Sequence, residues 1–367
     1  MNLMDKIPTR KEIESLGVYV PGKPIEEVKR EFGLDRIYKL ASNENPFGFS
    51  DLAKEAMIRE ISQTHTYPEG TAPMLGEKIA NHLGVPKEMV IIGNGSDELI
   101  RLLSRSYIRP GDEIIMADVT FPRYETNVRI EGGTVVSVPL IEGVHDLTGM
   151  LEAITDQTRM IFVCNPNNPT GTIVGREALE QFIQKVPPHI LLIIDEAYYE
   201  YVTDVDYLQT LPLLPQHPNM VILRTFSKIY GLAALRVGYG IMHPSIVAEL
   251  IKVKEPFNTN RIAQAAAWAA LDDADFIESC KQKNAEGRKY LEEEASKRGF
   301  SSYPSQGNFI MIQLDRPGDE VFLALLKKGI IVRSGGALGY PNTIRVSVGT
   351  PEENLAFVKA FEEVIDS

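Results

Sequence analysis

The feature that most constrains the fold is a series of short Ile- and Val-rich runs that alternate with helical segments from about residue 89 onward. The runs show little polar alternation, which is typical of strands buried on both faces of a mainly parallel sheet. Helical segments between consecutive runs indicate βαβ crossovers, so the sequence predicts an α/β fold. The candidate strands are Met89–Gly93, Glu113–Ala117, Thr134–Val138, Met160–Cys164, Ile190–Ile194, Val221–Arg224 and Val237–Ile241.

The chain changes character after about residue 255, where longer helical patterns surround three further strand candidates at 308–313, 330–333 and 343–348. This pattern predicts a second, smaller α+β unit. A length of 367 residues also exceeds what one hydrophobic core normally serves. We expect an N-terminal arm at 1–45 that packs with the small domain, a large domain at 46–255 and a small C-terminal domain at 256–367.

Charge and cysteine content argue against several classes of protein. The formal net charge of −12 argues against non-specific nucleic-acid binding, which needs a basic surface. The two cysteines, Cys164 and Cys280, cannot form a disulfide framework or a cysteine zinc site, and they fit a reducing compartment. The chain begins without the apolar segment of a signal peptide, and no apolar run reaches the roughly 18 residues of a membrane span. We therefore expect a cytoplasmic protein that binds neither nucleic acid nor membrane and holds no metal.

Two loops with phosphate- or ligand-binding character follow predicted strands. In Gly93–Glu98 the glycines permit a tight turn, and the helix that starts near Ser96 and Asp97 offers free N–H groups to an anion. An ordinary helix start is the alternative, and Glu98 stands where a dinucleotide-binding fingerprint has its third glycine. Asn165–Gly171 has the composition of a turn, but it lies where α/β folds place ligands.

Charged residues follow two more strands. Asp195 ends a buried run, where a carboxylate needs a partner: it either caps a helix or faces a bound cation, with Tyr198 nearby. Lys228 follows the next run and is either a solvated surface charge or a desolvated amine of the kind that forms Schiff bases. Thr225, Ser227 and Arg236 around it are suitable phosphate ligands.

Taken together, GNGSDEL, NPNNPTG, DEAY and TFSKIYGLAALR resemble the class I/II aminotransferases among the fold-type I pyridoxal-phosphate enzymes. LASNENPFG at 40–48, YPEG at 67–70 and IVRSG…LGYPNTIRVSVGT at 331–350 are similar to the histidinol-phosphate aminotransferases, closest to their Bacillus/Listeria-like branch. The resemblance covers nearly the whole chain. It implies a large domain with a mainly parallel seven-stranded sheet between helices, plus a smaller α+β domain.

The resemblance also implies how pyridoxal 5′-phosphate is held. Lys228 would carry it as a Schiff base, and Asp195 would pair with the pyridinium N–H so that the ring acts as an electron sink. Asn168 and Tyr198 would hydrogen-bond the ring oxygen, and Phe121 would stack on the ring. Lys228, Asp195 and Tyr198 would thus be the catalytic residues. The phosphate ligands would be the backbone at Ser96, Asp97 and Glu98, the side chains of Thr225, Ser227 and Arg236, and Tyr67 of the partner subunit, which makes a homodimer part of the site.

For the substrates, the resemblance implies that Arg345 binds the carboxylate of glutamate or 2-oxoglutarate. Arg333 would help to hold the phosphate of L-histidinol phosphate, since a guanidinium pairs well with either anion. Tyr19 would close over the site, and Asn45 belongs to the same substrate-binding set. A ping-pong cycle would then convert L-histidinol phosphate and 2-oxoglutarate to imidazole acetol phosphate and L-glutamate, in histidine biosynthesis.

Several alternatives remain open at this point. An aromatic amino acid transaminase, acting on tyrosine and phenylalanine, keeps the fold and changes the substrate. A pyridoxal-phosphate decarboxylase of a phosphorylated amino acid would share nearly all cofactor residues. A non-catalytic cofactor domain of a transcription regulator would need a winged-helix segment, for which the arm before Leu40 is too short. A nicotinamide-dependent dehydrogenase lacks support because its glycine pattern is absent.

Overall fold

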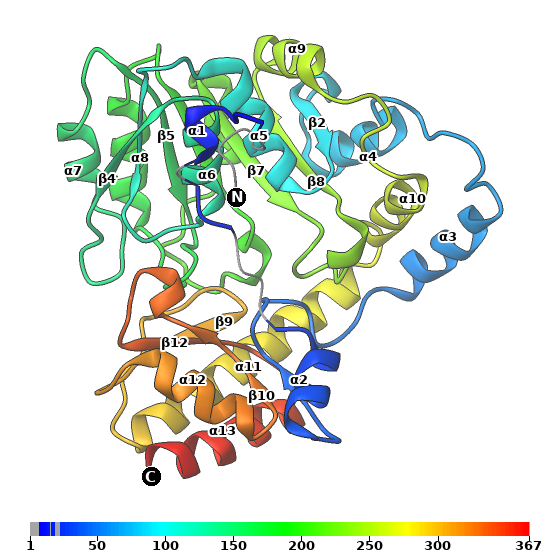
Figure 1. Cartoon of the computed structure of the whole chain (residues 1–367). Coiled ribbons are helices and arrows are strands. Elements are labelled where there is room, and N and C mark those ends of the chain that lie inside the picture. Colours follow the sequence, from blue (N-terminus) through cyan, green and yellow to red (C-terminus); the bar gives the residue numbers. More distant parts are fainter. Residues whose placement is uncertain (1–6, 15, 19–22, 367) are drawn as a thin grey trace.

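The computed structural model describes residues 7–14, 16–18 and 23–366. Its largest element is a seven-stranded sheet of order β2-β8-β7-β6-β5-β3-β4 (Figure 1). All neighbouring strands are parallel except that β8 runs antiparallel to both β2 and β7. The predicted α/β class is therefore confirmed. The strands are β2 (Val90–Gly93), β3 (Glu113–Ala117), β4 (Thr134–Val138), β5 (Thr158–Cys164), β6 (Leu191–Asp195), β7 (Met220–Thr225) and β8 (Gly238–Met242).

Helices cover both faces of this sheet, which explains why its strands lack polar alternation. In β5, Ile161 and Val163 enter one core cluster, whereas Met160 and Phe162 enter the other. The first cluster receives α4 (Pro73–Leu83), α7 (Leu147–Glu152), α8 (Arg176–Lys185) and α10 (Arg261–Ala270). The second receives α5 (Ser96–Tyr107), α6 (Arg123–Ile130) and α9 (Pro244–Val253). Helix α3 (Asp51–Ile61) packs along α10.

A second body is built on a three-stranded antiparallel sheet of order β11-β12-β9. Its strands are β9 (Phe309–Gln313), β11 (Arg333–Ser334) and β12 (Thr343–Ser347). Helices α11 (Ala274–Lys297), α12 (Gly318–Lys327) and α13 (Pro351–Ile365) pack around them over a separate apolar cluster that includes Leu325 and Phe361 (Figure 1).

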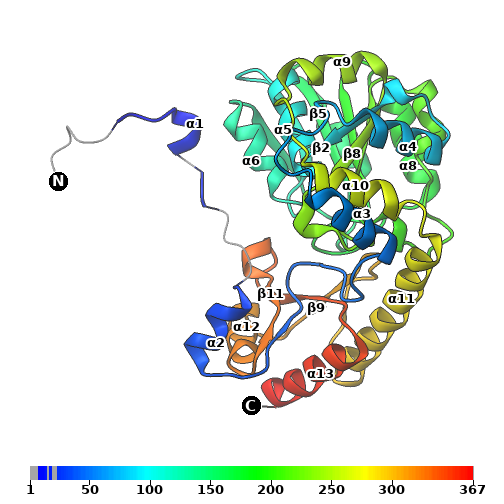
Figure 2. The same cartoon turned by 90° about the vertical axis from the view of Figure 1, so that its right-hand side faces the viewer.

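The N-terminal segment touches both bodies. Helix α2 (Ile25–Phe32) lies beside α12 (Figure 2). Val28 of α2 and Leu326 of α12 belong to one small apolar cluster. Strand β1 (Tyr38–Lys39) pairs with β10 (Ile330–Ile331). The short α1 (Lys11–Glu14) lies near α6, and Arg10 next to it donates a hydrogen bond to the carbonyl of Ile130 at 2.7 Å.

One predicted strand is divided in the structure. Residues 330–333 form the end of one sheet and the start of another, because β10 pairs in parallel with β1 while β11 pairs antiparallel with β12. The N–H groups of Tyr38 and Leu40 donate to the carbonyls of Gly329 and Ile331, and the chain changes partner after Val332. Among the residues that the structure describes, no helix has the length and apolarity needed to cross a bilayer.

Candidate active site

A cavity of about 220 Å³ lies where the carboxyl ends of β5, β6 and β7 meet the start of α5, the segment Ala41–Asn43 and the small sheet. In open α/β sheets, ligands bind at this end of the strands. Most of the residues singled out from the sequence converge here. Those lining the cavity are Ser96, Asp97, Phe121, Asn168, Asp195, Tyr198, Thr225, Ser227, Lys228, Arg236, Arg333 and Arg345.

Asp195 is a carboxylate held among neutral donors. It is the last residue of β6 and only 3% exposed. The hydroxyl of Tyr124 donates to Oδ2 at 2.6 Å and the N–H of Ala197 donates to Oδ1 at 3.1 Å. Burial raises the pKa of Asp195 to about 6, and these two hydrogen bonds oppose the rise. A cation in the cavity would relieve this desolvation, so Asp195 is suited to a protonated ring nitrogen.

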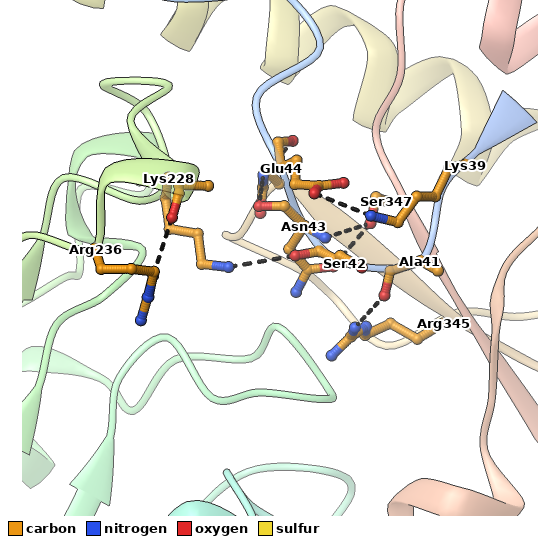
Figure 3. A network of polar contacts seen from close by, with 11 residues as sticks. Lys39, Ala41, Ser42, Asn43, Glu44, Lys228, Arg236, Arg345 and Ser347 are labelled. Atoms are coloured by element: carbon orange, nitrogen blue, oxygen red, sulfur yellow. Dashed lines mark hydrogen bonds and ion pairs between the residues drawn. The ribbon is translucent and has the colours of Figure 1, made fainter. Parts of the chain in front are cut away.

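Lys228 lies across the cavity, after the end of β7. Its Nζ donates to the carbonyl of Ser42 at 3.4 Å (Figure 3). Nζ also lies 5.5 Å from the ring centre of Tyr198. Burial lowers the pKa of Lys228 to about 8, with a further contribution from Arg345 that Glu44 opposes. A neutral amine is therefore accessible near physiological pH, as a nucleophile toward carbonyl groups requires.

This shift predicts a pH profile for the reactivity of Lys228. Because its pKa falls from 10.5 to about 8, the neutral fraction rises through pH 8 rather than through pH 10.5. Brief treatment of the cofactor-free protein with a small aldehyde and borohydride, followed by peptide mass spectrometry, should show labelling of Lys228 with a midpoint near pH 8. The exposed Lys185 in the same digest is the reference, and coincident profiles for the two lysines would contradict the prediction.

Tyr198, Asn168 and Phe121 line the same cavity as Asp195 and Lys228. Tyr198 is 3% exposed, and burial raises its pKa above the usual value, so the phenol is neutral. Its oxygen accepts a hydrogen bond from Asn43 Nδ2 at 3.0 Å. Asn168 Oδ1 accepts one from Arg345 Nη1 at 2.5 Å. Phe121 presents its ring to the cavity and contacts Tyr124 edge-on, with ring centres 5.5 Å apart.

The start of α5 forms an anion cradle with Arg236 and Ser227. The N-cap of α5 is Gly95, which offers no side-chain cap to the first N–H groups. Arg236 Nη1 donates to Ser227 Oγ at 3.1 Å, and a Cβ at Gly95 would come 2.5 Å from Arg236 Nη2. Arg236 also has a left-handed backbone with φ of 56°, a strained state that often occurs at functional sites. Helix N–H groups, a hydroxyl and a guanidinium are together suited to a phosphate.

Two guanidinium groups meet on the wall formed by the small sheet. Arg333 on β11 pairs directly with Arg345 on β12, so their side chains leave the same face. Arg345 is 6% exposed, and its Nη2 donates to the carbonyl of Ala41 at 2.8 Å (Figure 3). The cavity therefore has a second cationic region, which lies on the small sheet while the α5 cradle lies on the large one.

Four predicted site residues are not among those that line the cavity. Glu98 donates its N–H to the carbonyl of Gly95, while its carboxylate accepts the N–H of Asn94 at 2.7 Å and pairs with Arg101. Tyr67 is 78% exposed and stacks on Phe257. Asn45 donates to the carbonyl of Ile229 at 2.7 Å. Tyr19 lies outside the residues that the structure describes.

Sequence reasoning missed two residues of the site. Tyr124, which binds Asp195, stands in the same TFPRY segment as Phe121, and that proximity was the available signal. Asn43, which binds Tyr198, stands two residues before Asn45 in the NENP motif. Within the described residues, no group of three or more His, Cys, Asp or Glu side chains could hold a metal ion.

Comparisons with known proteins agree with this geometry. Residues 35–361 match the family model of aminotransferase class I and II. The chain is 52% identical to a histidinol-phosphate aminotransferase of Bacillus licheniformis, over 95% of this chain and 97% of that protein. It is 50% identical to one from a Geobacillus species, over 96% and 97%. The crystal structure of histidinol-phosphate aminotransferase from Sinorhizobium meliloti in complex with pyridoxal-5′-phosphate is similar, with a TM-score of 0.92, 29% identity and 99% coverage of each chain.

Proposed function

The chain belongs to the class I and II aminotransferases, and from this premise we propose that it transfers the amino group of L-histidinol phosphate to 2-oxoglutarate in histidine biosynthesis. The products are imidazole acetol phosphate and L-glutamate, and the cofactor is pyridoxal 5′-phosphate. The observation that carries the proposal is the cavity in which Lys228, Asp195 and the pair Arg333 and Arg345 face one space. Relatives named histidinol-phosphate aminotransferase match along nearly the whole chain.

The side chains present fit this cofactor. Asp195 would hold the protonated ring nitrogen, Lys228 would bind the aldehyde carbon, and the cradle of Arg236, Ser227 and the α5 N-terminus would hold the phosphate. Tyr198 and Asn168 would face the ring oxygen. When bound, pyridoxal phosphate supplies an electron sink that stabilises negative charge at the substrate Cα.

Lys228 would have two tasks in this proposal. The substrate amine would displace its amine, and the freed Nζ would then accept the proton from the substrate Cα as a general base and return it, as a general acid, to the cofactor carbon that Lys228 had held. The low pKa of Lys228, about 8, keeps enough of the amine neutral to accept a proton. The contact of Nζ with the Ser42 carbonyl at 3.4 Å helps to hold the free amine in the cavity.

Arg345 and Arg333 provide the substrate specificity. Arg345 would bind a carboxylate bidentately, and Arg333 would contribute to a phosphate site, since guanidinium groups suit both anions. The two substrates of a ping-pong cycle can then use one cavity in turn. Buried Arg345 also contacts Asn168, so the anion site and the ring-oxygen site are directly joined.

The half-reaction tests this function. Purified protein loaded with pyridoxal phosphate is mixed separately with L-histidinol phosphate, L-phenylalanine and L-tyrosine, and the loss of the visible absorbance band is followed. We expect fast conversion at low histidinol phosphate and a weak response to the aromatic amino acids. Equal or faster conversion by the aromatic amino acids would make the chain an aromatic transaminase. Carbon dioxide release without glutamate formation from 2-oxoglutarate would make it a decarboxylase.

A homodimer is also part of the proposal. Large apolar side chains are exposed on and beside the packed helices α3 and α10, where a second copy would cover them. Tyr67 of the partner subunit would then reach the phosphate cradle. The exposed apolar residues of this surface are Leu52, Ile58, Ile61, Tyr67, Met74, Phe257 and Trp268.

The cytoplasm is the proposed compartment, since both thiols are free and buried.

Introducing a charge into this apolar surface should dissociate the dimer. An Ile58→Asp variant places a carboxylate on a side chain that is 60% exposed in the monomer and would be buried in the dimer. We expect light scattering to give about 82 kDa for the wild type, twice the chain mass of 40.9 kDa, and the monomer mass for the variant. Val205→Asp, at a 90% exposed apolar residue elsewhere, is the matched control and should stay dimeric. A monomeric wild type would contradict the homodimer.

A further inference from the structure

Asn43 lies at the centre of the polar network that joins the N-terminal segment to the cavity. It is 1% exposed and has a left-handed backbone with φ of 54°, a conformation that asparagine tolerates better than most residues. It lines the cavity, and its Nδ2 donates to the phenol oxygen of Tyr198 at 3.0 Å. Figure 3 shows it beside Ser347 of β12, with Lys228 to its left and Arg345 to its lower right.

The orientation of the Asn43 amide is fixed by Ser347. The hydroxyl oxygen of Ser347 accepts the backbone N–H of Asn43 at 2.9 Å, so its own hydrogen is available for Asn43 Oδ1 at 2.8 Å. Oδ1 is thus an acceptor on one side, and the NH₂ group must face Tyr198 on the other. Asn308 Nδ2 donates to the Asn43 carbonyl at 3.0 Å and holds the backbone in place.

This orientation determines what the Tyr198 hydroxyl can do. A neutral phenol has one hydrogen to donate, and the Asn43 amide binds its oxygen as an acceptor. The hydrogen of Tyr198 is therefore left for another acceptor, and the side chain lines the cavity. Without the amide, the hydroxyl could rotate and accept from a ligand or water instead of donating.

We infer that Asn43 is a positioning residue that fixes the Tyr198 hydroxyl as a hydrogen-bond donor to the ring oxygen of pyridoxal phosphate. This inference rests on the proposed function and extends it to a residue outside the predicted set. The charged groups around Tyr198 are Arg345, Asp195 and Lys228. Asn43 is neutral, so its substitution leaves these three charges unchanged.

The test is a pH titration of the visible absorbance of the cofactor-loaded protein. A hydrogen bond donated by Tyr198 stabilises negative charge on the ring oxygen. The nitrogen that joins Lys228 to the cofactor carries a proton at low pH, and this proton also stabilises that charge. When the nitrogen loses its proton, the ring oxygen depends more strongly on Tyr198. Losing the donor therefore favours the protonated form and raises the titration midpoint, by about one pH unit. Asn43→Gly removes the amide without strain, because glycine accepts a positive φ. Ser347→Ala leaves the amide but frees its orientation and should give a smaller rise.

A double-substitution cycle separates positioning from a general effect. Tyr198→Phe should raise the midpoint about as much as Asn43→Gly, by about one unit. The Asn43→Gly/Tyr198→Phe protein should show no further rise. An unchanged midpoint in Asn43→Gly, or additive shifts in the double variant, would overturn the inference. An unchanged midpoint in Tyr198→Phe would remove its premise, and a wild type that takes up no pyridoxal phosphate would contradict the proposed function itself.

Discussion

We expect the Lys228→Ala protein to have no measurable turnover and no visible absorbance band after incubation with pyridoxal phosphate. The substitution removes the lysine amine that lines the cavity shortly after the end of β7. It removes both the nucleophile that binds the cofactor covalently and the general base at the substrate Cα, so the loss should reach about 10⁴-fold or more. Assay of glutamate formation and the absorption spectrum of the dialysed protein provide the two measurements.

The control for this variant is Lys185→Ala, at an exposed lysine near the end of α8, far from the proposed machinery. It should retain the band and the wild-type rate. Circular dichroism of Lys228→Ala should match the wild type, since the hydrogen bond that the substitution removes, from Nζ to the Ser42 carbonyl, is long at 3.4 Å. Turnover by Lys228→Ala at the wild-type rate would exclude Lys228 from the role proposed for it.

The second large effect is expected at Asp195, with opposite signs for activity and stability. Asp195→Asn keeps the shape but loses the negative charge that would stabilise a protonated ring nitrogen. We expect glutamate formation to fall by about 10²–10³-fold, as when a preorganised electrostatic partner is removed. Asp195→Glu should not restore the rate, because the longer side chain cannot keep both the Tyr124 and Ala197 hydrogen bonds.

Stability of the cofactor-free protein should change in the other direction. The pKa of Asp195 rises from 3.8 to about 6 on folding, so the folded state binds its proton more tightly between these values. The free energy of unfolding therefore falls as pH rises through this window, and at pH 7 the buried charge costs about 3 kcal/mol. Cofactor-free Asp195→Asn should unfold at a higher temperature than the wild type at pH 7, and the gap should shrink toward pH 4. The exposed Asp156→Asn should show neither effect.

The central strands were predictable from sequence because their Ile- and Val-rich runs are buried on both faces. Their direction was only partly predictable. A run such as 237–241 shows burial but not whether its hydrogen bonds are parallel, and β8 is antiparallel to both neighbours. The division of 330–333 between two sheets depends on the distant strand β1. Periodicity within the segment carries no information about that partner.

The residues of the site, too, were predictable where the evidence lies in the neighbouring sequence and not where it lies in a distant contact. Asp195 and Lys228 were recognisable because the first ends a buried strand and the second closely follows one, where parallel topology brings side chains to one edge. Tyr124 acts through a contact with Asp195, which is 71 positions away along the chain, and Asn43 through a contact with Tyr198, which is 155 positions away. Such contacts arise only when the chain has folded, so neither residue could be assigned from its own neighbourhood.

The segment Ala41–Asn45 also determines when a newly made chain can become active. It is among the first parts to be synthesised, yet its partners include Arg345 and Ser347 on the last strand. The carbonyl of Ala41 and the backbone of Asn43 find these partners only after nearly the whole chain has been translated. The central sheet can assemble earlier, but a ribosome-bound chain that ends before β12 has neither the anion-binding Arg345 nor the support of Asn43. We therefore expect competence to come with the last strand, and chains released before it to be inert even with Lys228 in place.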